Sequence, residues 1–292
     1  MLPSKKYVLE LLLLLISTRL SVVVCKRKFD PVLREELERE LYNFSSLLDR
    51  STPLSVPSSS VTILSIGSIE RKSYQILQNS TIGSMINILF FTEENTEPCR
   101  VCNGTNPYPL TKRRAYLHKP FDWWCAQKRP LSAIVEFMDK NTAPDFVLVV
   151  DDDTTIHPKH FLQFVSSLDP SLAFYMGDAG TSRKSDFVNG GGGWLVSRAL
   201  LLAMKKVDAF RVCLKKQQGG PWCMFHSDWV VGLCIRETLG VRPSNRRGIF
   251  LQSSMCSNVP VSCHQLGRMQ QYCEYYIKIV GIAQEHLGDT CP

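Results

Sequence analysis

Three consecutive aspartates are the clearest chemical feature of this sequence. Asp151, Asp152 and Asp153 directly follow the apolar run 146–150. A buried strand that ends in carboxylates places them at the carboxyl edge of a sheet, where open α/β sheets bind ligands. Adjacent carboxylates repel one another, and their oxygens suit hard cations such as Mn²⁺ or Mg²⁺, while Asp151 and Asp153 face the same side of an extended chain. The run therefore predicts a divalent metal site, with a solvated acidic turn as the alternative.

Four consecutive glycines, residues 190–193, form a second unusual segment. Because glycine carries no Cβ, Gly191 and Gly192 at its centre let the backbone approach a ligand closely. Ser197, just beyond the block, is placed to cap a helix over 197–207. The segment lacks the G-x-G-x-x-G spacing and the Walker lysine of phosphate-binding loops, so a flexible turn is the alternative.

Two further polar residues occur in short motifs later in the chain. Asp228 opens the apolar, helix-like run 228–239, where its charge favours the helix N-terminus, and capping alone would explain it. His264 ends the sequence Val261-Ser262-Cys263-His264. Taken alone, a single histidine near a chain end is more often structural than a ligand. Neither residue therefore establishes chemistry without the other motifs.

In their order and spacing, the four segments resemble the Fringe-like family of β-1,3-glycosyltransferases. The motifs are V-x-D-D-D at 149–153, F-x-x-G-G-x-G-x-x-x-S-R at 187–198, S-D-x-x-x-G at 227–232 and S-x-H at 262–264. Upstream, the stretch from Ile63 to Glu93 resembles the first βαβ unit of that family. The resemblance covers roughly residues 61–265. It implies a GT-A fold, in which a mixed sheet with a Rossmann-like nucleotide-binding half is flanked by helices.

The resemblance also implies the ligands and the residues that hold them. The donor would be a UDP-sugar, and the cofactor would be Mn²⁺ or Mg²⁺. Asp153 matches the metal-ligating aspartate, and His264 matches a late ligand of the metal or diphosphate. Asp151 and Asp152 match residues that contact the ribose or a metal-bound water. The resemblance thus implies metal ligation by Asp153 and His264.

The remaining positions imply the reaction. Asp228 matches the catalytic base, and Gly191 and Gly192 match glycines beside the donor sugar and the acceptor. A base that takes the proton from an attacking hydroxyl gives a single in-line displacement, which inverts the anomeric centre. The implied activity is transfer of a hexose or N-acetylhexosamine to a hydroxyl of a glycan or glycoprotein, with a β-1,3 linkage.

The sequence departs from the family pattern at several places. Residues 67–70 replace a basic, Thr-containing segment, with Arg71 shifted along the chain, and Trp194 stands where the family usually has Phe. A non-catalytic glycan-binding protein of the same fold is therefore one alternative. A second alternative is a phosphatase, because Asp151-x-Asp153-x-Thr155 also matches the D-x-D-x-T signature, although that nucleophile normally lies on the first strand.

The N-terminal segment 1–28 predicts entry into the secretory pathway. Two basic clusters, at 5–6 and 26–28, enclose 19 residues, about the length that spans a bilayer. Glu10 and Arg19 interrupt the apolar run, so a cleaved signal peptide and a buried helix are alternatives to an uncleaved signal anchor. We expect a stem over 29–60, a lumenal domain over 61–292, and a Golgi or ER type II membrane protein that is secreted if the segment is cleaved.

Cysteines and glycosylation motifs favour the same compartment. Acceptor triplets for N-glycosylation begin at Asn43, Asn79 and Asn103. Of 11 cysteines, one lies in the targeting segment, and the others permit paired disulfides. Those others are Cys99, Cys102, Cys125, Cys213, Cys223, Cys234, Cys256, Cys263, Cys273 and Cys291. A single C-x-x-C cannot complete a zinc site of that type, so a disulfide framework is the stronger prediction.

Composition and periodicity predict a globular α/β protein. Hydrophobic residues make up 44% and charged residues 21%, which excludes a chain disordered throughout. The net charge of +7 suits a phosphate-bearing partner, but without a long basic run we expect no nucleic-acid partner. Apolar runs and helical spacing alternate along the chain. They predict strands at 61–66, 86–91 and 146–150, and helices at 71–80, 131–141, 160–167, 197–207, 228–239 and 270–286.

Overall fold

The structure is a computed structural model. It describes residues 60–68, 71–93, 126–179, 187–219, 222, 225–246, 250–251, 261–264, 269–282 and 291. Several predictions concern residues outside these ranges. They are the targeting segment 1–28, the stem up to residue 59, the acceptors Asn43 and Asn103, and the departure at Glu70. Within the described ranges, no helix has the length and apolar character that crossing a membrane requires.

A six-stranded mixed sheet organises the fold, in the order β2-β1-β3-β6-β5-β7. The central parallel part pairs β1 with both β2 and β3, and β6 then runs antiparallel to β3 and β5. Its strands are β1 (Val61–Ser68), β2 (Asn87–Glu93), β3 (Phe146–Asp151), β5 (Tyr175–Gly177), β6 (Trp194–Ser197) and β7 (Ser244–Asn245). The predicted α/β class with a mixed sheet is confirmed.

A second sheet of three short strands lies where β3 ends, and the sequence did not predict it. Its order is β4 (Thr154–Ile156), β9 (Ser262–His264) and β8 (Phe250–Leu251). β4 and β9 run antiparallel, with Thr154 opposite His264. This pairing brings a segment from late in the chain beside the turn that contains the aspartates.

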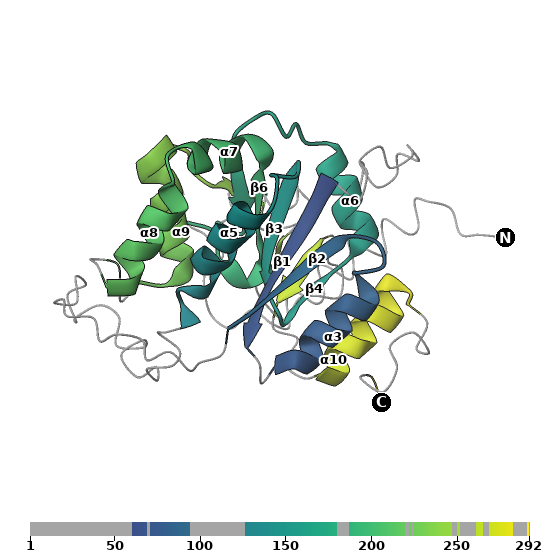
Figure 1. Cartoon of the computed structure of the whole chain (residues 1–292). Coiled ribbons are helices and arrows are strands. Elements are labelled where there is room, and N and C mark those ends of the chain that lie inside the picture. The colour runs from purple at the N-terminus through teal and green to yellow at the C-terminus, as the bar shows by residue number, and fades with distance from the viewer. Residues whose placement is uncertain are drawn as a thin grey trace, which may run out of the picture. The chain divides into compact units, whose positions relative to one another are not determined.

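Helices cover both faces of the larger sheet, close to the predicted positions (Figure 1). α5, α7, α8 and α9 lie on one side, and α3, α6 and α10 on the other. Their bounds are α3 (Lys72–Thr81), α5 (Arg129–Lys140), α6 (Pro158–Ser166), α7 (Arg198–Lys206), α8 (Ala209–Gly219), α9 (Ser227–Leu239) and α10 (Met269–Tyr275). α8 was not predicted, and α10 continues as the π-helix η5 (Tyr276–Val280). The Ser197 hydroxyl accepts from the Leu200 N–H, so the predicted cap of α7 is confirmed.

Two hydrophobic clusters fill the space between the sheet and its helices. Successive residues of β3 alternate between them: Leu148 and Val150 pack in one cluster, and Val147 and Val149 in the other. A fully buried side chain of this size stabilises the fold by about 1.5–3 kcal/mol relative to an exposed one. Strand β3 is therefore buried on both faces, which explains the unbroken apolar run before the aspartates.

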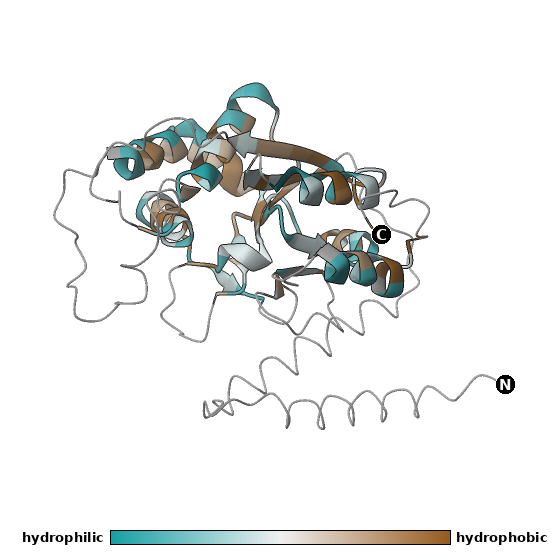
Figure 2. Cartoon of the chain, turned by 90° about the horizontal axis from the view of Figure 1, so that it is seen from below, coloured by the Kyte–Doolittle hydropathy of each residue, from teal (hydrophilic) through white to brown (hydrophobic). Residues whose placement is uncertain are grey.

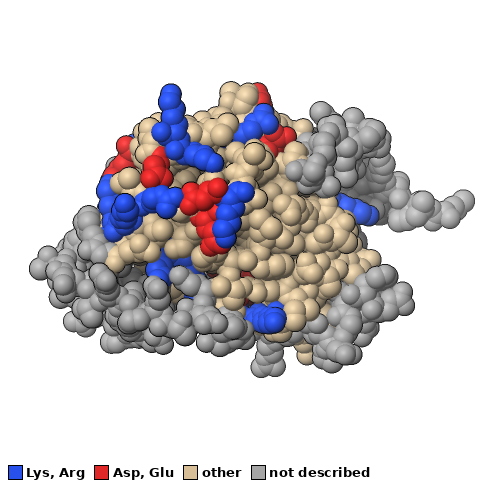
Figure 3. Space-filling view, in the orientation of Figure 1, with Lys and Arg blue, Asp and Glu red and all other residues tan. Residues whose placement is uncertain are grey.

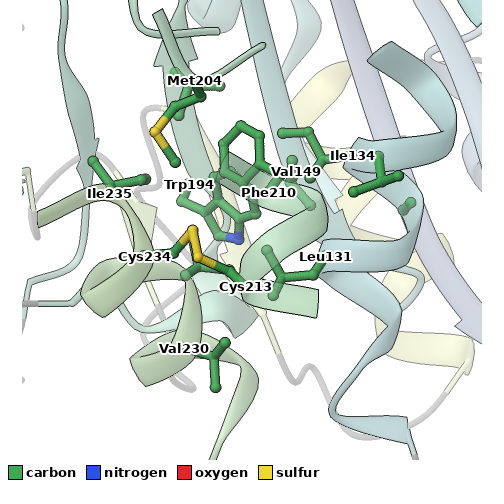
Figure 4. Close-up of a cluster of buried hydrophobic side chains, with 14 of the residues drawn as sticks. Leu131, Ile134, Val149, Trp194, Met204, Phe210, Cys213, Val230, Cys234 and Ile235 are labelled. Atoms are coloured by element: carbon green, nitrogen blue, oxygen red, sulfur yellow. A yellow bond between two sulfur atoms is a disulfide. The ribbon is translucent and has the colours of Figure 1, made fainter. Parts of the chain in front are cut away.

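Two disulfides occur among the described cysteines, as the disulfide framework predicts. Cys213–Cys234 joins α8 to α9 inside the second cluster, with Cα atoms 5.9 Å apart (Figure 4). Cys273–Cys291 ties α10 to the end of the chain, with Cα atoms 5.5 Å apart. Each disulfide therefore fixes a helix that borders the site described below.

The helices are amphipathic, and their outer faces carry charges of both signs. Figure 2 shows hydrophobic and hydrophilic colours on the same helices. Over α5, α7 and α8, basic and acidic side chains are interspersed (Figure 3). Arg211 pairs with Asp139 at 2.7 Å, and Lys140 pairs with Glu136 at 2.5 Å. On this face the positive net charge does not gather into a patch of one sign.

Candidate active site

The turn between β3 and β4 presents the three aspartates. β3 ends at Asp151 and β4 begins at Thr154, so Asp152 and Asp153 form the connection. The side chain of Asp152 is 1% exposed, while that of Asp151 is 44% exposed. The buried strand thus delivers one buried and two accessible carboxylates to the carboxyl edge of the sheet.

Two of these carboxylates and His264 form a candidate metal centre. The ligand atoms of Asp151, Asp153 and His264 all lie within 4.8 Å of one another. The His264 Nε2 lies 2.9 Å from an oxygen of Asp153 and 3.6 Å from an oxygen of Asp151. Two carboxylates with one imidazole suit a divalent cation such as Mn²⁺. The residues present therefore fit the metal that the sequence predicts.

Arg71 supplies positive charge to the same cluster. Its guanidinium lies 3.0 Å from an oxygen of Asp152 and also forms an ion pair with Asp153. From the sequence, Arg71 was noted only as a basic residue displaced along the chain from the position of the family's basic segment. Its position at the start of α3, beside the end of β1, explains how it reaches the turn.

Burial and mutual interactions set the pKa values of the three aspartates and His264. Partial desolvation at the sheet edge and the charge of Asp153 raise the pKa of Asp151 to about 6, and burial raises that of Asp152 to about 7, although Arg71 opposes both shifts. Burial also acts on Asp153, but hydrogen bonds and charges from His264 and Arg71 outweigh it and lower its pKa. Despite its own burial, His264 has a raised pKa because it contacts Asp153. Asp153 is thus the carboxylate most firmly held in its charged form.

The glycine block packs directly against this centre. Gly190–Gly192 form the 3₁₀ helix η3, and Gly193 has a φ of 90°, a conformation that favours glycine. The hydroxyl of Thr154 donates to the Gly191 carbonyl at 2.8 Å. A Cβ on Gly191 would lie 2.3 Å from the Nδ1 of His264. The absent side chain therefore makes room for the imidazole.

Asp228 lies on the other side of the same glycine turn. It occupies the first turn of α9, where its carboxylate accepts from the Ser227 hydroxyl at 3.2 Å. A Cβ on Gly190 would lie 2.4 Å from an oxygen of Asp228. Burial raises the pKa of Asp228, and hydrogen bonds from the Gly190 backbone and Ser227 oppose the shift. Adjacent glycines thus contact His264 and Asp228, which connects all the predicted site residues in one region.

Sequence reasoning missed one buried amide that supports the turn. Gln78 on α3 is 2% exposed, and its Nε2 donates to the Thr154 carbonyl at 2.9 Å and to the Asp151 carbonyl at 3.3 Å. Its Oε1 accepts from the Ser65 hydroxyl at 2.5 Å. A polar residue on the buried face of an amphipathic helix was the available signal. Gln78 fixes the backbone on both sides of Asp152 and Asp153.

Solved glycosyltransferases show distant similarity to the chain. A glycosyltransferase involved in glycosylation of the major capsid of PBCV-1 is 16% identical, with a TM-score of 0.43, over 71% of this chain and 93% of that one. The apo-form glycosyltransferase GlyE of Streptococcus pneumoniae TIGR4 is 9% identical, with a TM-score of 0.42, over 71% of this chain and 54% of GlyE. The chain thus spans about half of GlyE.

The sequence model of the Fringe-like family matches residues 119–255. This range contains the three aspartates, the glycine block and Asp228, whereas Arg71 and His264 lie outside it. No curated protein matches the chain. The family match supports a glycosyltransferase, and the resemblance to the Fringe-like family that the motifs predict is confirmed over residues 119–255.

Proposed function

We propose that the protein is a metal-dependent inverting glycosyltransferase. It would move a hexose or N-acetylhexosamine from a UDP-sugar to a hydroxyl of a glycan or glycoprotein, forming a β-1,3 linkage. One observation carries the proposal: a single glycine turn separates a metal-competent triad from Asp228, a carboxylate whose pKa burial raises. Such a pairing of a cation site with a general base suits displacement of a nucleoside diphosphate.

The triad would hold the cation. Asp151, Asp153 and His264 supply the donor atoms for Mn²⁺ or Mg²⁺, which when bound offsets negative charge on a leaving diphosphate. Asp152 is nearly inaccessible and pairs with Arg71, so in this proposal it holds Arg71 near the triad. The contact with the ribose is assigned to Asp151, the most exposed of the three.

Asp228 would act as the base. It takes the proton from an acceptor hydroxyl as that oxygen attacks the anomeric carbon, and the opposite bond to the diphosphate breaks. A carboxylate with a raised pKa accepts this proton more readily than an ordinary one. In this proposal Gly191 and Gly192 lie beside the donor sugar and the acceptor, and the missing Cβ of Gly191 leaves room for the His264 imidazole. Displacement from one side inverts the anomeric centre.

We further propose that the domain over 61–292 is lumenal. Residues 1–28 would anchor it to the Golgi or ER membrane as a type II protein, or release it into the secretory pathway if they are cleaved. The two disulfides support an oxidising compartment, and the acceptor Asn79 lies exposed on α3. The segment 29–60 would serve as the stem.

A donor screen tests the proposed function. The full-length chain in detergent is incubated with Mn²⁺, a panel of UDP-sugars and glycan acceptors, and release of UDP is measured with and without EDTA. We expect one UDP-sugar to support transfer that EDTA abolishes. If UDP does not bind in the presence of Mn²⁺, the enzyme proposal fails and a glycan-binding role is favoured. Phosphate release from an aryl phosphate without UDP release would instead support a phosphatase.

A further inference from the structure

The C-terminal helical segment α10–η5 borders the candidate metal centre, although it lies outside the family match and carries no sequence motif. Three of its tyrosines are buried: Tyr272 is 2% exposed, Tyr275 is 4% and Tyr276 is 0%. They pack in the same cluster as α3 and α6. The segment thus presents aromatic hydroxyl groups to the interior next to β4.

Two of these hydroxyls bond to the backbone that follows the aspartates. The Tyr272 hydroxyl donates to the carbonyl of Asp153. The Tyr276 hydroxyl accepts from the Ile156 N–H at 3.3 Å. Both contacts fix the same strand and turn. Of the two, only the Tyr272 contact is made to a candidate metal ligand.

Asp153 is therefore held from two directions. His264 and Arg71 contact its carboxylate, while Tyr272 contacts its carbonyl. The two sides are linked through Tyr74, whose ring packs edge-on against Tyr272 with centroids 5.0 Å apart. The guanidinium of Arg71 lies 5.2 Å from the centroid of the same Tyr74 ring. Helix α3 thus connects the groups on both sides of Asp153.

A covalent tie secures the helix next to this contact. Cys273, the residue after Tyr272, is bonded to Cys291. Cys273 is 4% exposed and packs in the same cluster as the tyrosines. The disulfide therefore limits movement of α10 relative to the chain end, at the turn of helix that carries the Tyr272 hydroxyl.

We propose that Tyr272 is a positioning residue for Asp153, and that it raises the affinity of the site for a divalent cation. A metal ligand binds tightly when the groups behind it fix its orientation, and loss of such a partner weakens binding. Because Tyr272 holds the Asp153 carbonyl, it fixes the backbone from which the carboxylate projects. This inference rests on the proposed metal-dependent function.

Matched Tyr→Phe variants of the full-length chain test the inference. Tyr272→Phe keeps the ring that packs on Tyr74 and removes the hydroxyl. Tyr276→Phe is the control, because it removes a buried hydroxyl that bonds to the same strand but contacts no aspartate. Mn²⁺ is titrated into each protein without a nucleotide, and free Mn²⁺ is measured by electron paramagnetic resonance. We expect Tyr272→Phe to weaken Mn²⁺ binding by about 3- to 10-fold, and Tyr276→Phe to change it by less than about 2-fold.

Thermal unfolding at increasing Mn²⁺ gives a second measure of affinity, because a ligand of the folded state raises Tm with its concentration. This measurement works even if a variant is less stable. Equal weakening by both variants, or unchanged binding by Tyr272→Phe, would overturn the inference while leaving the proposed function intact. If the unaltered protein binds no Mn²⁺ either alone or with UDP, both the inference and the metal-dependent function are wrong.

Discussion

The candidate site places aspartates in two opposite environments: Asp153 lies at its metal-binding end, and Asp228 lies at the end that would hold the base. At one end, His264 and Arg71 contact Asp153, and their charges lower its pKa despite burial. At the other end, the Asp228 carboxylate accepts from the Ser227 hydroxyl and the Gly190 backbone, and burial raises its pKa. At Asp153 the cationic neighbours outweigh desolvation and favour a charged metal ligand, whereas at Asp228 desolvation outweighs the surrounding donors and favours a base. The neighbours of each aspartate, rather than its type, determine its chemistry.

Exchanging each carboxylate for an amide gives the largest effects and tests this division. We expect Asp228→Asn to reduce transfer by about 10²- to 10⁴-fold, the usual contribution of a general base, and to leave Mn²⁺ affinity unchanged. Asp153→Asn should remove Mn²⁺ binding as well as transfer, because it deletes a ligand. Transfer kinetics and Mn²⁺ titration on the same samples distinguish the two. Full transfer by a folded, Mn²⁺-binding Asp228→Asn protein would show that Asp228 is not the base.

The neighbouring glycines allow each end to be disturbed separately. An alanine Cβ at position 191 would meet His264 Nδ1 at 2.3 Å, and one at position 190 would meet Asp228 Oδ1 at 2.4 Å. We expect Gly191→Ala to weaken Mn²⁺ binding by about 10-fold or more, because it displaces a candidate ligand. Gly190→Ala should lower the rate of transfer with little change in Mn²⁺ affinity. The same effect of both variants on both measurements would mean that the ends are not independent.

The sequence predicted the aspartates of this site better than the contacts that hold them in place. The apolar run before Asp151 and the residues that follow it placed the carboxylates at a sheet edge, because burial on both faces leaves an unambiguous pattern. The contacts of Arg71, Gln78 and Tyr272 depend on how helices pack on the sheet. That packing brings together residues such as Tyr272 and Asp153, which are 119 positions apart. No local sequence pattern indicates contacts between residues so far apart in the chain.

A smaller effect is expected on the pH dependence of stability. It concerns Asp152, the buried partner of Arg71. Its pKa is raised from 3.8 to about 7, so the folded protein retains a proton that the unfolded chain releases between these values. The free energy of unfolding should therefore fall as the pH rises through this window. Urea unfolding in EDTA at several pH values measures the slope. Asp152→Asn cannot titrate and should reduce the slope, leaving the part that comes from Asp151, whose pKa is raised to about 6. An unchanged slope would assign the effect to another group.

The smallest expected effect comes from the hydroxyl beside Asp228. Ser227 Oγ donates to the Asp228 carboxylate at 3.2 Å and lowers its pKa, in opposition to burial. Ser227→Ala removes this donor, so the pKa of Asp228 should rise further and the acidic limb of the kcat/KM profile should move to higher pH. We expect the rate at the optimum to change by less than about 3-fold, because a single neutral hydrogen bond contributes little.

Lys278→Ala, which removes an exposed ion pair with Glu274 on the opposite flank, is a control that should leave the profile in place. A shift of the limb to lower pH would mean that the Ser227 hydroxyl does not stabilise the charged form of Asp228, and the contrast with Asp153 would then lose one of its supports.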